Sequence, residues 1–376
     1  MLRLVTTQEE LASVCDRLLR EPVVALDTEF LCERTYYPIL GLVQVAVADG
    51  DCFLLDTVRL DSLRPLGPVL ANPGSVKILH DAREDLAILL REVAKSGSFF
   101  KPANIFDTRL AAGFAGLSAS ASLKALLAKL LDVHLAKTET RSNWIRRPLR
   151  DEQIQYAADD VIYLPRLRTE LLSRCPGARA RRWLDEEMRK YDDPSLYAGR
   201  DPREMWSHVC GLTRPLAENA RAKAAPHRYF AVLRELAAWR ETLAQAKDWP
   251  PRHVLTDPML LALASEQPRS VQAFRGVNGI PERLPAAVAA QGVAAIQQGL
   301  AVPEADCPGL PSLSEPEREQ LHKRVASEIA RVNAACGIEG IDPAVVISKA
   351  RLERIFRDGL PNPLEAGWRR ELLAHR

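Results

Sequence analysis

The sequence predicts an α/β domain followed by two small all-α domains. Short apolar, β-branched runs alternate with helical patterns in its first half, and no convincing strand pattern follows Arg174. This order of strands and helices indicates a mixed sheet in one domain of about two hundred residues, which is an ordinary size. We expect this domain, with a connecting helix, over 1–203, a first helical domain over 204–301 and a second over 302–376.

Four strands are expected in the α/β domain. The apolar run that opens Val23–Phe30 predicts a buried strand, and Leu42–Val47 predicts the next. Asp49-Gly50 is a hairpin turn signal, so Cys52–Leu55 is expected to return beside its predecessor. The domain therefore opens with a three-stranded meander, and Val76–Leu79 is expected to add a further strand.

Helices are expected between and after these strands. Thr7 and Glu10 form a capping-box pattern, which starts a helix that we expect to end near Leu19. Pro165 is expected to bend the longest helical segment. The other expected helices are Leu60–Leu70, His80–Val93, a segment from Phe106 through Phe114, Ser122–Leu131, Asp151–Leu172 and a basic helix that includes Arg179–Arg182.

The second half contains a faint internal repeat. Five apolar or proline positions recur at an offset of 92 residues. The pairs are Pro251 with Pro343, Val254 with Val346, Leu255 with Ile347, Leu260 with Leu352 and Leu263 with Ile355. Self-similarity at a fixed offset indicates two copies of one small helical module.

Composition excludes several classes of protein. The net charge of +2 gives no overall argument for nucleic acid, so any basic surface must be local. The seven cysteines are scattered without a Cys-x-x-Cys pair, which argues against zinc and against a disulfide framework. No apolar run approaches a membrane span and no leader pattern opens the chain, so we expect a cytoplasmic protein without membrane contact. We also expect a monomer. The lack of a Gly-rich Walker-type loop argues against an ATPase or helicase, and no nucleotide cofactor is expected.

A pair of carboxylates ends the first expected strand. Asp27 and Glu29 are two residues apart, so strand periodicity places them on one face. Adjacent like charges destabilise a sheet unless a cation, such as magnesium, neutralises them. The alternative is a strand end that runs into solvent, where Asp and Glu are ordinary. Further carboxylates would favour the metal site.

Two later helices supply such carboxylates. The segment 80–86 opens a helix, where acidic residues ordinarily complement the helix dipole. It offers Asp81, Glu84 and Asp85. In the segment 155–161, Tyr156 and Asp160 are four residues apart and share one helical face, while Asp159 is a rival. Neither helical pattern is enough by itself to identify a metal site.

Together these segments resemble the three exonuclease motifs of the DEDD superfamily in its Tyr-bearing branch, and most closely those of the bacterial ribonuclease D family. Asp27-Thr-Glu-Phe30 is similar to the first motif. His80-x-x-x-Glu-Asp85-Leu is similar to the second, which implies Asp85 rather than Asp81. Tyr156-Ala-Ala-Asp-Asp160 is similar to the third, which selects Asp160. The segments 106–108 and 143–149 also resemble this family, and the two helical copies resemble its helicase-and-RNase-D C-terminal (HRDC) domain.

The resemblance implies a ribonuclease H-like fold and a 3′-5′ exoribonuclease. It implies hydrolysis with two divalent ions, Mg²⁺ or Mn²⁺, and release of nucleoside 5′-monophosphates. The implied metal ligands are Asp27, Glu29, Asp85 and Asp160. Tyr156 is expected to orient the attacking water, because a phenol of pKa about 10 is a poor general base at neutral pH. The implied substrates are tRNA precursors and other structured RNA with a free 3′ end.

Other residues are weaker candidates, and two other functions stay open. The candidate substrate contacts are Lys137, Trp144, Arg146 and Arg147, although Lys137 also fits a solvated loop and Trp144 a packing anchor. Asp107 is expected to cap a helix and His80 to be a satisfied buried histidine. The alternatives are a DNA-directed 3′-5′ exonuclease on the same domain and a nucleic-acid-binding scaffold with a vestigial site. The intact acidic positions disfavour the scaffold.

Overall fold

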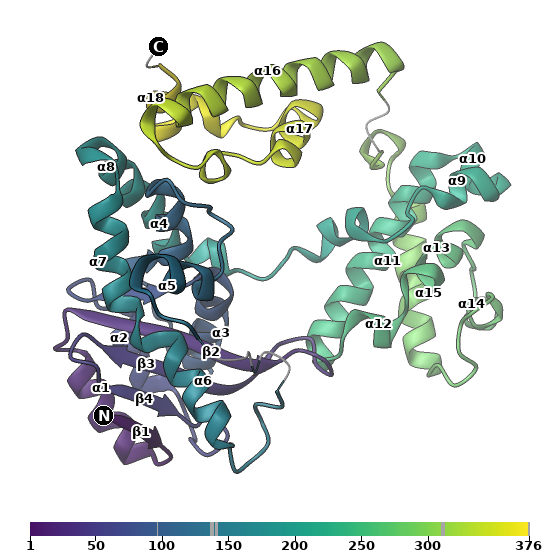
Figure 1. Cartoon of the computed structure of the whole chain (residues 1–376). Coiled ribbons are helices and arrows are strands. Elements are labelled where there is room, and N and C mark those ends of the chain that lie inside the picture. Colours follow the sequence, from purple (N-terminus) through teal and green to yellow (C-terminus); the bar gives the residue numbers. More distant parts are fainter. Residues whose placement is uncertain (96, 136–138, 140–141, 310–312, 375–376) are drawn as a thin grey trace. The chain divides into compact units, whose positions relative to one another are not determined.

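The computed structural model describes residues 1–95, 97–135, 139, 142–309 and 313–374. The chain forms two compact units, and its elements are labelled in Figure 1. The first unit contains Met1–Leu31, Leu40–Ala198 and Leu313–Arg376. The second contains Cys32–Ile39 and Gly199–Ser312. The boundaries at 203/204 and 301/302 stay predictions, and the units change at Ala198/Gly199 and Ser312/Leu313.

A mixed sheet is the centre of the first unit. Within the described residues it has six strands in the order β1-β4-β3-β2-β5-β6, so β2 lies inside the sheet with a neighbour on each side. β3 and β4 are antiparallel, whereas β2 with β5, β5 with β6 and β1 with β4 are parallel. The strands are β1 (Leu2–Val5), β2 (Val23–Leu31), β3 (Ile39–Val47), β4 (Cys52–Leu55), β5 (Val76–Leu79) and β6 (Ile105–Asp107).

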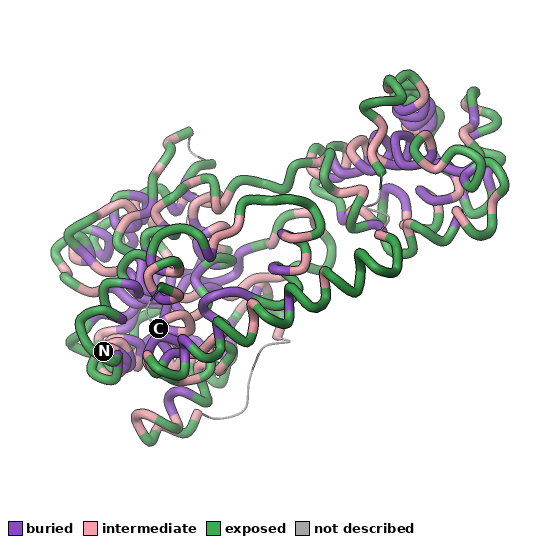
Figure 2. Tube along the Cα trace, turned by 90° about the horizontal axis from the view of Figure 1, so that it is seen from above, coloured by how far each residue is buried: buried purple, intermediate pink, exposed green. Residues whose placement is uncertain are grey.

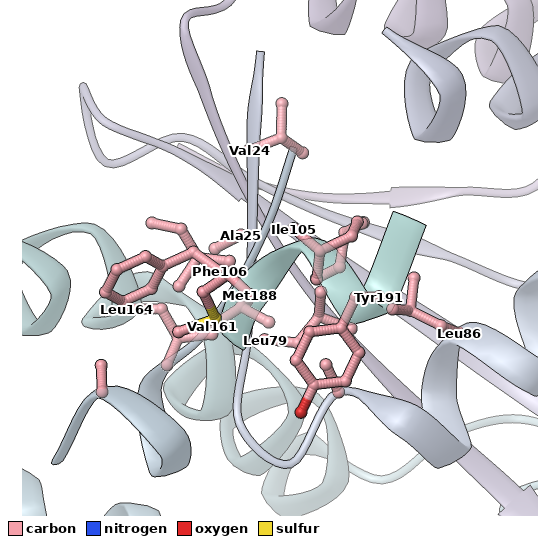
Figure 3. Packing of buried hydrophobic residues seen from close by; sticks show 14 of the residues in the cluster. Val24, Ala25, Leu79, Leu86, Ile105, Phe106, Val161, Leu164, Met188 and Tyr191 are labelled. Atoms are coloured by element: carbon pink, nitrogen blue, oxygen red, sulfur yellow. The ribbon is translucent and has the colours of Figure 1, made fainter. Parts of the chain in front are cut away.

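Helices pack against this sheet and close its core. They are α1 (Gln8–Leu18), α2 (Gly67–Ala71), α3 (Arg83–Ala94), α4 (Thr108–Phe114), α5 (Leu123–Leu131), α6 (Asp151–Ile162), α7 (Leu164–Arg174) and α8 (Gly177–Met188). Apolar side chains of β2, β5 and β6 meet those of α3, α6 and α7 in Figure 3. Figure 2 shows buried residues in the interior of each of the two units, with many exposed residues along the loops. This core fixes β2 and α6, the two elements that carry most of the expected site.

Most of the expected elements are confirmed, but one expected helix is wrong and two strands were missed: four strands were expected, whereas the described residues form six, including β6 where the lead-in to a helix was expected. Thr7 caps α1 in a full capping box, and Pro165 stands in the first turn of α7, just after α6 ends. The helix expected over Leu60–Leu70 is wrong. The chain there forms only a 3₁₀ turn and the five-residue α2, because Pro65 and Pro68 lack the N–H groups that a helix interior needs. Strand β1 was not expected, since its leucines are partly exposed at the edge of the sheet.

The internal repeat is confirmed by matching helices. The long helices α11 (Pro226–Lys247) and α16 (Glu315–Glu339) end at equivalent positions, and each is followed by a left-handed residue. The next full helices, α13 (Asp257–Glu266) and α17 (Lys349–Asp358), have the same length and also end on left-handed residues. The remaining α-helices of the two copies are α9 (Arg214–Glu218), α10 (Ala220–Ala224), α12 (Pro251–Val254), α14 (Val271–Gly276), α15 (Ala286–Ala301) and α18 (Gly367–Ala374).

The second helical copy is part of the same compact unit as the sheet. The ring of Trp368 in α18 lies 5.1 Å from that of Phe114 and 6.0 Å from that of Trp183, measured between centroids. Arg369 pairs with Glu187 at 2.7 Å. Within the other unit, the first copy binds the loop Cys32–Ile39. In the described part of the chain, no helix has the length and apolar character needed to cross a membrane.

Candidate active site

Three carboxylates from two elements converge in the first unit. Asp27 and Glu29 lie two residues apart on β2, and Asp160 comes from α6. One carboxylate oxygen from each lies within 4.8 Å of the others. All three side chains are partly buried, so the end of β2 does not run into solvent as an ordinary surface strand would. Strand periodicity and helix packing therefore bring together acidic groups that are far apart in the chain.

Buried apolar neighbours hold three of the four acidic residues, Asp27, Asp85 and Asp160, in place. Asp27 follows Leu26 and Asp160 precedes Val161, and both of these apolar side chains are fully buried in the core. Asp85, in the first turn of α3, likewise precedes the buried Leu86. Each carboxylate thus stands one residue from an anchor that cannot move without opening the core. The backbone that carries these three carboxylates is therefore held by the close packing of the core.

Asp85 is joined to β2 through Thr28. Thr28 stands between Asp27 and Glu29, is 5% exposed, and donates a short hydrogen bond from its hydroxyl to Asp85. Asp85 lies outside the group of three that converges within 4.8 Å, but its charge still acts on Asp27 and Glu29. Asp81, its rival in sequence, is exposed and pairs with Arg109. The structure therefore links Asp85, and not Asp81, to strand β2.

The electrostatics of the cluster favour proton uptake or a bound cation. Burial and then repulsion from Asp85, Asp160 and Glu29 raise the pKa of Asp27 well above its ordinary range. Burial, with repulsion from neighbouring carboxylates, raises the pKa of Glu29 to about 8. Burial likewise raises the pKa of Asp85 to about 7 and that of Asp160 to about 6, although bonds from Thr28 and Tyr156 oppose these shifts. Such shifts arise where like charges share a desolvated site.

Tyr156 lies beside the carboxylates on the same helix as Asp160. Burial raises its pKa, and the neighbouring carboxylates raise it further, so the phenol keeps its proton. Its hydroxyl donates a hydrogen bond to Asp160. The ring centroids of Tyr156 and Trp144 are 6.0 Å apart. Trp144 is 1% exposed, so it acts as the packing support of Tyr156 rather than as an open surface for substrate.

The donor set fits divalent metal ions. Asp27, Glu29 and Asp160 offer only carboxylate oxygens, which are the ligands of hard cations such as Mg²⁺ and Mn²⁺. Among the described residues, these three and Asp85 have no ion pair with a basic side chain. A bound divalent cation would neutralise the repulsion that otherwise raises the pKa values of these carboxylates.

Comparison with known proteins identifies the chain. Residues 2–175 match the family described as 3′-5′ exonuclease, and residues 230–287 match the HRDC domain. Ribonuclease D of Desulfotalea psychrophila is 33% identical over 379 residues, which cover 98% of this chain and 96% of that protein. Ribonuclease D of Granulibacter bethesdensis is 34% identical over 375 residues, which cover 98% of this chain and 90% of that one. The chain belongs to the ribonuclease D family.

A solved structure agrees with this assignment. The crystal structure of Escherichia coli RNase D, described as an exoribonuclease involved in structured RNA processing, matches with a TM-score of 0.79 and 26% identity. The match covers 100% of this chain and 96% of that one. The sheet unit therefore has the ribonuclease H-like exonuclease fold, and a helical region with an HRDC domain follows it. As a ribonuclease D family member, the chain is a 3′-5′ exonuclease that uses divalent metal.

Two candidate substrate contacts of this ribonuclease D family member, Arg146 and Arg147, have different environments in the structure. Arg147 is occupied within the protein: it donates to both oxygens of the buried Asp56, at 2.7 and 2.6 Å, and to the carbonyl of Gly41 at 2.7 Å. It therefore holds the segment around Trp144 against the sheet, and a substrate contact is not assigned to it. A Cβ on Gly41 would come within 2.5 Å of the Trp144 carbonyl oxygen, which requires glycine there. Arg146 is exposed and stays a proposed substrate contact.

The other expected residues have definite places. Lys137 lies outside the described residues. Asp107 caps α4 as expected, and it also accepts a hydrogen bond from Tyr191. His80 is satisfied through Thr108 at 2.9 Å. Thr28 is the site residue that sequence reasoning missed, and its position inside the Asp-x-Glu pair was the available signal.

Proposed function

We propose that the chain is a 3′-5′ exoribonuclease that trims RNA precursors, tRNA above all, and releases nucleoside 5′-monophosphates. The main support for this proposal is the convergence of Asp27, Glu29 and Asp160 in a 3′-5′ exonuclease domain. Asp85 is joined to the same strand by a hydrogen bond from Thr28. The description of Escherichia coli RNase D as an enzyme of structured RNA processing supports an RNA substrate here.

We infer that Asp27, Glu29, Asp85 and Asp160 hold two divalent ions, Mg²⁺ or Mn²⁺. Two such ions supply a hydroxide-like nucleophile at neutral pH and stabilise the attacking and leaving oxygens of phosphodiester hydrolysis. Asp27 is the proposed shared ligand, because the charges of the other three carboxylates all act on it. Thr28 fixes the orientation of Asp85 through its hydroxyl.

Tyr156 is proposed to position the attacking water and not to take its proton. Its raised pKa keeps the phenol protonated at neutral pH, so its hydroxyl acts as a hydrogen-bond donor. The buried Trp144 ring limits the positions that the Tyr156 ring can take. A donor of this kind acts mainly in the transition state, so Tyr156→Phe is expected to lower kcat more than it raises KM.

The test is digestion of RNA and DNA oligonucleotides of the same sequence in Mg²⁺, Mn²⁺ or chelator, with products separated by length. The proposal expects stepwise shortening of RNA from its 3′ end, release of 5′-monophosphates and no products in chelator. Faster digestion of DNA would favour the DNA-directed alternative, because the 2′-OH distinguishes the two substrates. Binding of RNA without cleavage in either metal would favour the scaffold.

A further inference from the structure

The second unit contains a pocket that the proposed catalytic chemistry does not use. Its volume is about 640 Å³, which lies within the usual range for small-molecule sites. Its charged lining residues are Arg214, Arg240, Arg252 and Asp257. The lining therefore includes three basic residues and one acidic residue, a charge balance that favours an anion.

The single carboxylate is already committed to the protein. One oxygen of Asp257 accepts from Arg240 at 2.7 Å, and the other accepts from the backbone N–H of Cys210 at 2.9 Å. The Arg240 side chain is 8% exposed, and its Nε has no hydrogen-bond partner in the described part of the chain. Asp257 can therefore offset the charge of Arg240 but not that of the other two arginines.

Arg214 and Arg252 can still offer their positive charge to an anionic ligand. Arg252 donates to the backbone carbonyl of Glu33 at 3.2 Å, a partner without formal charge. Arg214 pairs with Glu218, but the two side chains are 72% and 60% exposed, and such a surface pair is weak. The helix α13 also begins at this pocket, with its cap residue Thr256 in the wall, and a helix N-terminus attracts anions.

Two exposed aromatic residues belong to segments that adjoin the pocket lining in the chain or are hydrogen-bonded to such a segment. Trp249 directly precedes Pro250 and Pro251, which line the pocket, and it is 49% exposed. Tyr37 is 38% exposed, and its backbone N–H donates to Asp248, the neighbour of Trp249, at 3.0 Å. Arginines beside exposed aromatic rings are the combination that binds unpaired nucleotides, through phosphates and stacked bases.

We propose that this pocket binds a backbone phosphate of an unpaired stretch of the RNA substrate, with a neighbouring base stacked on Trp249. The proposal rests on the proposed RNA substrate and adds a binding site to it. Arg214 and Arg252 contact the phosphate, and the buried Arg240–Asp257 pair holds the wall in shape. The site recognises single-stranded backbone and not a particular sequence.

The first test compares two pairs of arginines in the full-length protein. Binding of a labelled single-stranded oligoadenylate of about 16 nucleotides is measured by anisotropy in EDTA at several salt concentrations. Arg214→Gln with Arg252→Gln should reduce the slope of log K against log salt by about 1.4, because each phosphate contact on a single strand contributes about 0.7. The control is Arg269→Gln with Arg283→Gln, two exposed arginines of the same unit outside the pocket lining, which should bind like the wild type. Equal slopes for the pocket variant and the wild type would overturn the proposal.

The second test isolates the aromatic ring. Trp249→Ala should weaken binding by about five- to 150-fold, the range for losing one base-stacking side chain, and Trp249→Phe should restore most of it. If Trp249→Ala binds oligoadenylate with the affinity of the wild type, Trp249 does not stack on a base. Hydrolysis of a short RNA in Mg²⁺ separates this proposal from the proposed function. If the wild type does not hydrolyse the short RNA, the proposed exoribonuclease function is wrong. If the pocket variants bind oligoadenylate as tightly as the wild type does, only the proposed binding site is wrong.

Discussion

In the first unit, the carboxylate cluster and the buried ion pairs differ in how burial and neighbouring charges shift the pKa of their carboxyl groups. Asp56 is fully buried but is held by Arg147, and Glu187 is held by Arg369. Burial works against the charged form of Glu187, yet Arg369 outweighs it and lowers the pKa of this carboxyl. In the cluster, burial and mutual repulsion raise the pKa of every carboxylate instead.

The difference distinguishes charges kept for structure from charges kept for function. A paired buried charge contributes little net stability, but removing one partner is costly. A cluster of unpaired carboxylates lowers the free energy of unfolding as long as nothing neutralises it. A fold retains such a cluster where a ligand supplies the opposite charge. The two kinds of site should therefore respond oppositely to neutralisation of one acidic side chain.

The largest expected effect is on activity. Asp27→Asn should lower the rate of RNA hydrolysis by about 10³-fold or more, since even one lost electrostatic donor can cost 10²–10³ in kcat. Its melting temperature should stay equal or rise, because a repelled charge is removed. Asp159→Asn is the matched control: Asp159 bonds to Gln155 at 2.8 Å on the same helix as Asp160, and its loss should leave the rate near that of the wild type. A single-turnover assay and a thermal melt measure both, and an active Asp27→Asn enzyme would refute the assignment.

The opposite behaviour is expected at the ion pair. Arg147→Ala leaves Asp56 buried and unpaired, and should lower the free energy of unfolding by about 3–5 kcal/mol. Molecules that remain folded should still cleave RNA, since Arg147 serves the fold. Urea unfolding with Arg146→Ala as the exposed neighbouring control gives the comparison. Unchanged stability in Arg147→Ala, or selective loss of RNA affinity, would return Arg147 to the substrate contacts.

A smaller effect is expected from pH. Because Glu29, Asp85 and Asp160 have native pKa values of about 8, 7 and 6, the folded protein binds more protons than the unfolded chain above the ordinary carboxyl range. Its stability in EDTA should therefore fall as pH rises from about 4 to 8. Each kcal/mol lost should lower the melting temperature by about 2–4 °C in a unit of this size. Thermal melts should show a shallower slope with saturating Mg²⁺ or in Asp27→Asn, and identical slopes under all three conditions would contradict this account.

The comparison also shows what the sequence could and could not predict. Strand periodicity placed Asp27 and Glu29 on one face, and helix periodicity placed Tyr156 with Asp160, because these relations are local. The link between Thr28 and Asp85 depends on how α3 packs beside β2, and no local pattern encodes that. The role of Arg147 depends on Asp56, which is 91 residues away in the chain. Local patterns therefore predicted the Asp27–Glu29 pair and the shared face of Tyr156 and Asp160. The family resemblance selected Asp85 and Asp160 over their neighbours, and the partners of these residues required the fold.

The most direct test of the central claim is calorimetric titration of Mn²⁺ into the metal-free protein near pH 7, in two buffers of different ionisation enthalpy. If the buried carboxylates are the metal site, the wild type and Asp159→Asn should bind Mn²⁺ and release protons, because the raised pKa values of Glu29 and Asp85 leave these groups partly protonated without metal. Asp27→Asn should bind far more weakly. Equal Mn²⁺ binding by Asp27→Asn and the wild type, with no proton release in either, would contradict the claim that this cluster holds the catalytic metal.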